Sequence, residues 1–450
     1  MTQNRTLLRD ITASKSMRPF FIIWGGQAFS LLGSGLVQFA LIWYLTTTTG
    51  SAMVLATASI MGLLPQLLLG PVAGTLVDRW NRRRVMIVAD SLIALVTALL
   101  ALCFFFDWVS LWLIYLVMFV RSLGSAFHWP AMQASTPLLV PENQLTRIAG
   151  LNQALQGAAN IVTPPLGALL LATLPMQGLL AIDVGTAIIA ILPLLFIHIP
   201  NPNRQDLQEP EQERKPSVLD DLRAGFVFVW SWPGLALIFG MGFTINIFLT
   251  PALMLLPVMV TATFGGGALA LAWVQASWGL GTIGGGLLLS IWSGFPNRMV
   301  TVLVGAILMG ISILVVGFIP ATFLSVLMIA LGFSGAMNTI VIGTFVAIVQ
   351  TTVPNMLQGR VFTLFGSINS VMVPVGLLLA APIADRVGVQ LWFILAGIVM
   401  VVLFSIGFFI PSLLHLEAQD RQVVATPKQK ITSPVNMPAQ RMEGTTPIAG

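Results

Sequence analysis

The sequence predicts an all-α polytopic membrane protein with twelve transmembrane helices in two six-helix bundles. Three observations carry this prediction. The chain of 450 residues is 56% hydrophobic and only 8% charged, whereas soluble domains carry about 25% charged residues. Its apolar runs are about 20 residues long or longer, which is the length of a helix that crosses a bilayer. Its basic residues gather in the short segments between those runs, as membrane topology requires.

Apolar runs of about 18 residues or more occur twelve times along the chain. Their approximate limits are residues 19–44, 52–77, 85–106, 111–139, 148–173, 179–199, 233–262, 268–292, 299–319, 323–350, 361–383 and 391–411. The seventh run contains Pro251 and Pro257, and we expect a long helix kinked at these prolines. A membrane barrel would instead show alternating segments of about ten residues, and the sequence shows no such alternation.

The positions of lysine and arginine predict that both termini lie in the cytoplasm. With the N-terminus inside, 19 of the 21 basic residues fall on cytoplasmic segments. Arg386 falls on an outer segment, and Arg121 falls within the fourth span. An asymmetry this large sets the orientation of a multi-pass protein in the cell membrane. The same placement accounts for the basic net charge without a nucleic-acid partner.

Polar segments divide the chain into five parts. We expect a cytoplasmic N-terminus over residues 1–18, a six-helix bundle over 19–199, a cytoplasmic linker over 200–232, a second six-helix bundle over 233–411 and a disordered tail over 412–450. The linker mixes acids and bases, as solvated linkers do. Within it, residues 217–230 are a candidate amphipathic helix on the membrane surface.

Two short segments recur at equivalent places in the two halves. VPENQLTR (Val140–Arg147) is matched by VPNMLQGR (Val353–Arg360), and each follows one span and opens the next. IVTPPLGALLL in the fifth span is matched by VMVPVGLLLAA in the eleventh. Parallel halves of this kind are found in transporters whose halves rock about a site near the middle of the bilayer. The repeat therefore predicts a transporter.

The chain lacks the sequence motifs of intramembrane enzymes. It contains no H-E-x-x-H, no G-x-S-x-G and no paired aspartates within the spans. It also has no P-loop, which excludes a self-contained ATP-driven pump. A sensor would need a sizeable soluble domain, and no segment is long enough for one. We expect a transporter rather than an enzyme, with neither a cofactor nor a metal site.

The loop between the second and third spans resembles a signature of the major facilitator superfamily, G-x-L-x-D-R-x-x-R-R/K. The matching residues of GTLVDRWNRRR are Gly74, Leu76, Asp78, Arg79, Arg82 and Arg83. The resemblance implies the major facilitator fold. It also implies a latch, in which Gly74 allows close helix approach and Asp78 holds arginines and a helix end of the other half in the outward-facing state. A loop kept basic only by topology is the alternative interpretation.

A closer resemblance covers most of residues 15–415, outside the linker. Segments such as FVRSLGSAFHWPAMQASTPLLVPENQLT and GRVFTLFGSINSVMVPVGLLL resemble the macrolide-efflux group of drug:proton antiporters. This resemblance implies a monomer that exports hydrophobic and amphiphilic drugs such as macrolides by alternating access, driven by protons. Lysophospholipid and siderophore transporters of the same superfamily look broadly similar, so they remain the alternative.

Four ionisable side chains in the spans are candidates for proton coupling: Asp183, Arg121, Asp90 and His128. An arginine near mid-bilayer is costly unless it faces a cavity or a partner. Arg121, in RSLGSAF, resembles the arginine implicated in proton relay among antiporters of the superfamily. Pairing with backbone carbonyls, which would fix the helix, is the alternative role.

Asp183, in AIDVG of the sixth span, is our first candidate for the proton carrier. Low-dielectric surroundings favour the protonated form of a carboxyl, so that it can load and release protons. A hydrogen-bonded structural acid is the alternative. Asp90 is also interpreted as a local partner of the loop arginines, and His128, which titrates near neutrality, as a packing residue.

In the fold implied by the resemblance, spans 1, 2, 4, 5, 7, 8, 10 and 11 surround a central cavity. The candidates for its lining are Gln27, Gln38, Trp129, Asn152, Gln153, Gln156, Asn160, Phe243, Asn246, Gln275, Trp278, Asn338, Phe365 and Asn369. Amides in a bilayer are costly unless they bond across helices or face water, so interhelical hydrogen bonding is the alternative for any one of them. A mixed apolar and amide cavity suits large amphiphilic molecules. Arg121 is the only cation within the spans, which argues against strongly anionic substrates.

Overall fold

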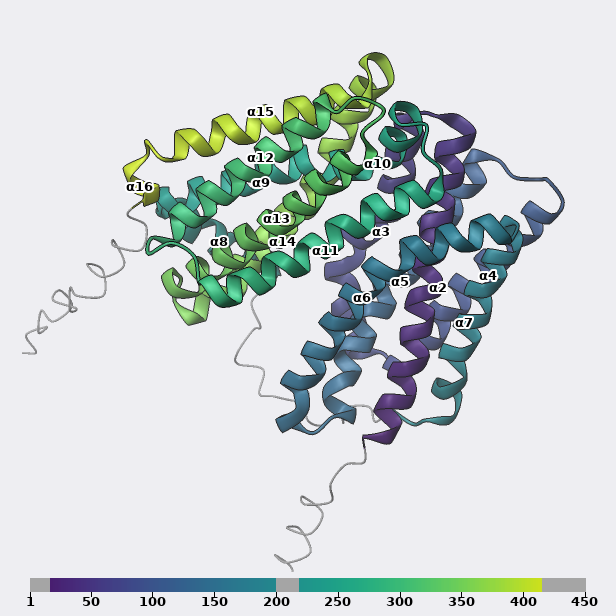
Figure 1. Ribbon diagram of the computed structural model, residues 1–450. Helices are drawn as coiled ribbons and strands as arrows, with labels where there is room; N and C mark the ends of the chain where they lie inside the picture. Colours follow the sequence, from purple (N-terminus) through teal and green to yellow (C-terminus); the bar gives the residue numbers. More distant parts are fainter. Residues whose placement is uncertain (1–16, 200–217, 415–450) are drawn as a thin grey trace, which may run out of the picture.

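The computed structural model describes residues 17–199 and 218–414, and the regular elements in these ranges are all helical (Figure 1). Most of the expected N-terminal segment, linker and tail (residues 1–16, 200–217 and 415–450) lies outside the described residues. The expected amphipathic helix of the linker lies partly inside them and corresponds to α8 (Val218–Ser231).

The first half contains six long helices. They are α2 (Arg18–Thr49), α3 (Ala52–Arg79), α4 (Arg82–Phe105), α5 (Leu111–Leu139), α6 (Leu145–Thr173) and α7 (Met176–Phe196). The second half follows α8. Its helices are α9 (Pro233–Met254), α10 (Leu256–Val258), a π-helical turn (Met259–Thr263), α11 (Ala268–Trp292), α12 (Arg298–Phe318), α13 (Leu324–Thr352), α14 (Asn355–Val387), α15 (Val389–Gly407) and α16 (Pro411–Leu414).

Eleven helices of the described residues are long and apolar enough to cross a membrane, against the twelve spans expected from the sequence. The remaining expected span, 268–292, is helix α11. Its 25 residues are sufficient in length, but several glycines, three tryptophans and Gln275 make it less apolar than the others. The all-helical membrane fold predicted from the sequence is confirmed.

Three expected boundaries change for physical reasons. Helix α2 continues through its threonine run to Thr49, because hydroxyls such as that of Thr46 donate back to carbonyl oxygens one turn earlier, at 2.7 Å. The seventh span is interrupted rather than only kinked: α9 ends at Met254, since Pro257 has no N–H to continue the helix. Helix α14 continues to Val387, so Arg386 lies in its last turn and not in a loop beyond the span.

The two halves repeat one packing scheme. Helices α2 to α7 of the first half correspond in order to α9 and α11 to α15 of the second. Within each half the second helix packs on the fourth (α3 on α5, α11 on α13) and the third packs on the sixth (α4 on α7, α12 on α15). The two VP segments lie at equivalent places, because Pro141 and Pro354 both have extended backbone angles just after a helix end. The internal repeat inferred from the sequence is therefore present in the packing.

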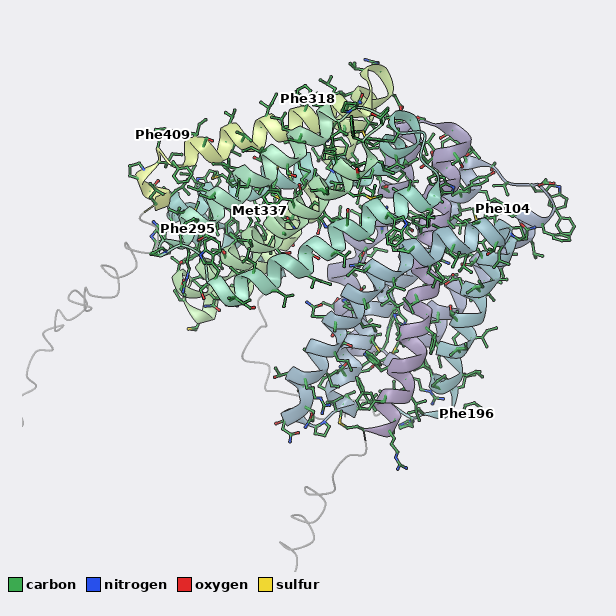
Figure 2. The ribbon with its side chains drawn as sticks, viewed as in Figure 1. Phe104, Phe196, Phe295, Phe318, Met337 and Phe409 are labelled. Carbon is green, nitrogen blue, oxygen red and sulfur yellow. The ribbon has the colours of Figure 1, made fainter. Side chains whose placement is uncertain are left out.

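The halves meet through two equivalent pairs of helices. Helix α3 packs on α14, and helix α6 packs on α11. The two bundles touch at one end and diverge from there, with the first half running downward and the second to the left in Figure 1. Large apolar side chains such as Phe196, Phe318 and Phe409 project from the outer faces of the bundles (Figure 2), where each is more than 60% exposed. These faces suit the hydrocarbon of a bilayer.

Candidate functional site

A buried ion pair and its hydrogen-bond partners join four helices in the first half. Asp183 of α7 is 1% exposed, and its Oδ2 lies 2.5 Å from Nη1 of Arg121 on α5. The same guanidinium nitrogen donates to the hydroxyl of Thr97 on α4. Thr97 and Ser34 of α2 donate to the Asp183 carboxylate, each at 3.3 Å. The arginine therefore meets the requirement of a charged partner inside a membrane. The alternative role, pairing with backbone carbonyls, is not the arrangement that forms.

A second acidic cluster lies nearby on α4. Nε2 of Gln27 on α2 donates to Oδ2 of Asp90 at 3.0 Å. Nε2 of His128 on α5 lies 3.3 Å from Oδ1 of the same carboxylate, which is an ion-pair distance when the imidazole is protonated. The interpretation of Asp90 as a partner of the loop arginines is wrong. Its carboxylate lies on the inward face of α4, away from the loop, and meets Gln27 and His128 there.

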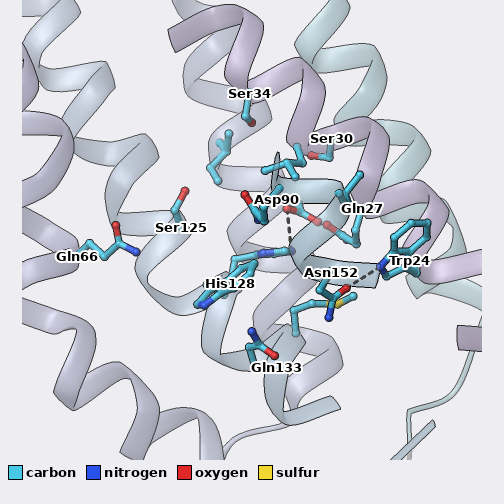
Figure 3. A pocket seen from close by; sticks show the side chains of 16 residues that line it. Trp24, Gln27, Ser30, Ser34, Gln66, Asp90, Ser125, His128, Gln133 and Asn152 are labelled. Atoms are coloured by element: carbon cyan, nitrogen blue, oxygen red, sulfur yellow. Dashed lines mark hydrogen bonds and ion pairs between the residues drawn. The ribbon is translucent and has the colours of Figure 1, made fainter. Parts of the chain in front are cut away.

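The Asp90 cluster opens into a cavity of about 420 Å³ within the first half (Figure 3). Four of the expected lining residues are found there: Gln27, Trp129 and the pair Asn152 and Gln156 from α6; Gln133 of α5 lines the cavity as well. Trp24, which was not among the sequence candidates, donates its indole N–H to Oδ1 of Asn152 at 2.7 Å. Gln27 and Asn152 both line the cavity and form hydrogen bonds between helices. Cavity lining and interhelical hydrogen bonding are therefore combined in the same side chains.

A second cavity of about 310 Å³ lies within the second half. It includes the expected Asn246, Trp278, Asn338, Phe365 and Asn369. The Asn246 amide donates to Oδ1 of Asn369 at 2.9 Å, joining α9 to α14. The ring of Phe365 lies 4.7 Å from that of Phe345 and 5.9 Å from that of Phe243, measured between centroids. No acidic or basic side chain is among the residues that line this cavity.

Several expected lining residues lie elsewhere. Gln38, Gln153 and Asn160 are exposed and are not among the residues of either cavity. Asn152, Gln156 and Asn160 follow one another at i, i+4, i+8 spacing on α6, but only the first two are among the residues that line the cavity. Gln275 also lies outside both cavities, and Phe243 belongs to the aromatic cluster beside the second cavity rather than to its lining.

The loop between α3 and α4 is tied to its own half. Nη1 of Arg82 donates to the carbonyl oxygen of Ala134 at 2.9 Å, and Arg83 donates to the carbonyl oxygens of Leu194 and Leu195. These carbonyls lie near the C-terminal ends of α5 and α7, where cations are favoured. In this arrangement a Cβ at Gly74 would meet no atom within 4 Å, so no close helix approach is made there. The side chain of Asp78 lies outside the description.

One carboxylate that bridges the halves was not a sequence candidate. Asp385, near the C-terminal end of α14, accepts hydrogen bonds from the backbone N–H groups of Ala52 and Met53 and from the hydroxyl of Ser51. These donors lie at the N-terminal end of α3. The sequence signal for this contact is the dipeptide Asp385–Arg386, which repeats Asp78–Arg79. Both residues fall after the expected eleventh span, which ends at residue 383, so neither was expected in a helix.

Comparisons with known proteins agree with this architecture. Over 382 residues the chain is 36% identical to macrolide efflux protein A of Streptococcus pyogenes, covering 85% of this chain and 93% of that protein. It is 27% identical over 412 residues to the multidrug efflux pump Tap of Mycolicibacterium fortuitum, covering 89% of this chain and 97% of the pump.

Solved structures show the same fold at low sequence identity. The nucleoside transporter NupG superposes with a TM-score of 0.63 at 15% identity, covering 86% of this chain and 99% of that one. The human organic anion transporter MFSD10 superposes with a TM-score of 0.55 at 18% identity, covering 87% and 99%. The family model of the Major Facilitator Superfamily matches residues 23–372. The chain is a multi-pass membrane protein and belongs to the major facilitator superfamily.

Proposed function

We propose that this protein exports amphiphilic drugs such as macrolides by alternating access, driven by proton antiport. The observation that carries the proposal is the pair of buried acid–base clusters in the first half, Asp183 with Arg121 and Asp90 with His128. The second cluster faces a cavity. The names of the macrolide and multidrug efflux relatives supply the substrate class.

Alternating access is supported by the way the halves meet. They are joined at one end through α3 with α14 and α6 with α11, and they diverge toward the other end (Figure 1). If the basic loops face the cytoplasm, as the positive-inside rule implies, this is an inward-open arrangement of a monomer with cytoplasmic termini. The cavities of the two halves then receive a substrate from the cytoplasm or from the inner leaflet.

Two clusters are the candidate sites of a coupled proton. If the His128 imidazole is protonated, the Asp90 carboxylate at 3.3 Å pairs with the imidazolium. Protonation of Asp183 would release Arg121 from its ion pair, because a neutral carboxyl no longer compensates the guanidinium charge. We propose that one or both of these changes accompanies the switch between states.

The proposal is tested by drug accumulation in an efflux-deficient bacterial host. Cells that express the protein are expected to accumulate less labelled macrolide and less ethidium than cells with an empty vector, and a protonophore should remove the difference. Unchanged accumulation of both drugs contradicts drug export. A change in a labelled lysophospholipid or siderophore instead would assign the transporter to the alternative substrate class.

The aromatic cluster of the second half should influence which drugs are exported. Phe365→Ala removes ring contacts with Phe345 and Phe239, whose centroids lie 4.7 and 5.1 Å away. One aromatic contact is worth about 1 kcal/mol, or roughly fivefold in affinity. We expect the ratio of macrolide to ethidium export to change by about that factor. Phe318→Ala, on the outer face of α12, is the matched control and should leave the ratio unchanged.

A further inference from the structure

The carboxylate of Asp385 is a contact between halves and not a part of either bundle. Its Oδ1 accepts from the Ala52 N–H at 2.6 Å, and its Oδ2 accepts from the Met53 N–H at 3.1 Å and from the Ser51 hydroxyl at 2.8 Å. The first backbone N–H groups of a helix have no partner within the helix, and they carry the positive end of its dipole. An anion at this place makes charge-assisted hydrogen bonds, which are stronger than neutral ones.

Helix α3 does not need Asp385 in order to form. Ser51 is its own N-cap, because the hydroxyl oxygen accepts from the Val54 N–H at 3.4 Å. Asp385 also lies in the second half, while α3 belongs to the first. The contact therefore adds little to the folding of either bundle. Its main effect is to stabilise the association of the two bundles at the closed end.

The other end of the same helix pair has the residues for a reciprocal contact. Asp78 precedes Arg79 at the C-terminal end of α3, as Asp385 precedes Arg386 near the C-terminal end of α14. The N-terminal end of α3 meets the C-terminal end of α14, so the two helices run in opposite directions. The N-terminal end of α14, at Asn355, consequently lies on the side of Asp78. Each helix thus carries an acid near its C-terminal end, on the side where its partner helix begins.

We propose that Asp385 is a positioning residue that holds the outer side closed, and that it alternates with Asp78 at the opposite ends of α3 and α14. Rigid halves that rock about a central axis can close only one end at a time. In the proposed cycle, the Asp78 end is separated while the Asp385 contact, which this structure contains, is formed. When the outer side opens, the Asp385 contact breaks and the Asp78 contact forms. This inference rests on the proposed transport function, which the experiment scores separately.

Spin-label distances in nanodiscs measure the two ends directly. In a Cys103→Ser background, one pair of labels replaces the exposed side chains of Met53 and Val387 at the closed end. A second pair replaces the exposed Val72 and Met356 toward the other end. Asp385→Asn should lower the ratio of closed to open populations at the Met53–Val387 end roughly tenfold. Asp78→Asn should raise this ratio.

Two further variants make the result decisive. Ser51→Ala removes one of the three donors to Asp385 and, with it, the N-cap hydroxyl of α3. It leaves Asp385 in place and should give a smaller shift in the same direction, so it tests the inference even if Asp385→Asn is not recovered folded. Asp107→Asn changes an exposed acid in the loop before α5, where asparagine accepts the positive φ of 57°. It should shift nothing. Unmoved distances in both Asp385→Asn and Ser51→Ala, or an equal shift in Asp107→Asn, overturn the inference.

Drug accumulation separates the two proposals. Export of macrolide by the wild type together with unmoved distances in the variants overturns the latch and leaves the proposed function standing. Moved distances in a protein that exports neither drug leave the latch standing and overturn the proposed function. If both hold, Asp385→Asn should also lower the rate of export.

Discussion

Replacing Asp183 by asparagine is expected to abolish drug export and to lower the stability of the purified protein. Asparagine leaves Arg121 without its counter-ion in a site where the guanidinium is about one-tenth exposed. Removing one partner of a buried ion pair costs about 3–5 kcal/mol, a large part of the stability of a typical domain. Thermal unfolding in detergent measures the stability, and accumulation of macrolide and ethidium measures the export.

A double variant separates the structural role of the pair from its role in transport. Asp183→Asn combined with Arg121→Gln removes both charges, so no uncompensated charge is left buried, and that charge is the main cost of breaking a buried pair. We expect the double variant to unfold near the wild-type temperature and still to export no drug. Ser34→Ala is the control, because it removes only a 3.3 Å hydrogen bond to Asp183. Wild-type export by Asp183→Asn would contradict a coupling role for this carboxylate.

The second large effect is expected at the seam between α11 and α13. A Cβ at Gly281 would lie 1.8 Å from the carbonyl oxygen of Gly332, and one at Gly285 would lie 2.3 Å from that of Ala336. These are backbone atoms, so neither helix can yield by rotating a side chain. Gly281→Ala forces the helices apart, and overpacking of this kind costs about 1–3 kcal/mol. We expect a clear fall in the thermal unfolding temperature and in the yield of folded protein.

Gly284 offers a matched control on the same helix. A Cβ at this position meets no atom within 4 Å, and alanine is favoured over glycine in a helix by about 0.5–1 kcal/mol. Gly284→Ala should therefore leave the protein as stable as the wild type or slightly more stable. An equal loss of stability in the two variants would show that glycine is needed for helix flexibility and not for the close contact.

The fold followed from the sequence because a bilayer leaves few alternatives. Apolar runs of spanning length must form helices, and the basic loops order them. The expected helix ends were wrong where polar residues extend a helix beyond its apolar segment. The threonines that end α2 bond back to their own helix, and Asp385 lies in the last turns of α14. A search for apolar runs ends a span at the first such residues.

The site was predicted less completely, for a different physical reason. A charge inside a membrane needs a partner, so Asp183, Arg121, Asp90 and His128 could be selected from the sequence. Their pairing could not, since it depends on how α4, α5 and α7 are rotated against one another. The same holds for the amides: Asn152 and Gln156 face a cavity and Asn160 does not, although all three share one helical stripe.

The cavity of the second half, with aromatic rings and amides but no charged lining residue, has a consequence for evolution and for inhibitor design. Substitutions there alter shape and apolar contact without adding or removing a titratable group. In the proposed drug export, the range of substrates can therefore change through this half while the titratable groups of the first half stay unaltered. An inhibitor that binds the Asp90–His128 cluster should remain effective across such variants, whereas one that fills the aromatic cavity should lose potency as the cavity changes.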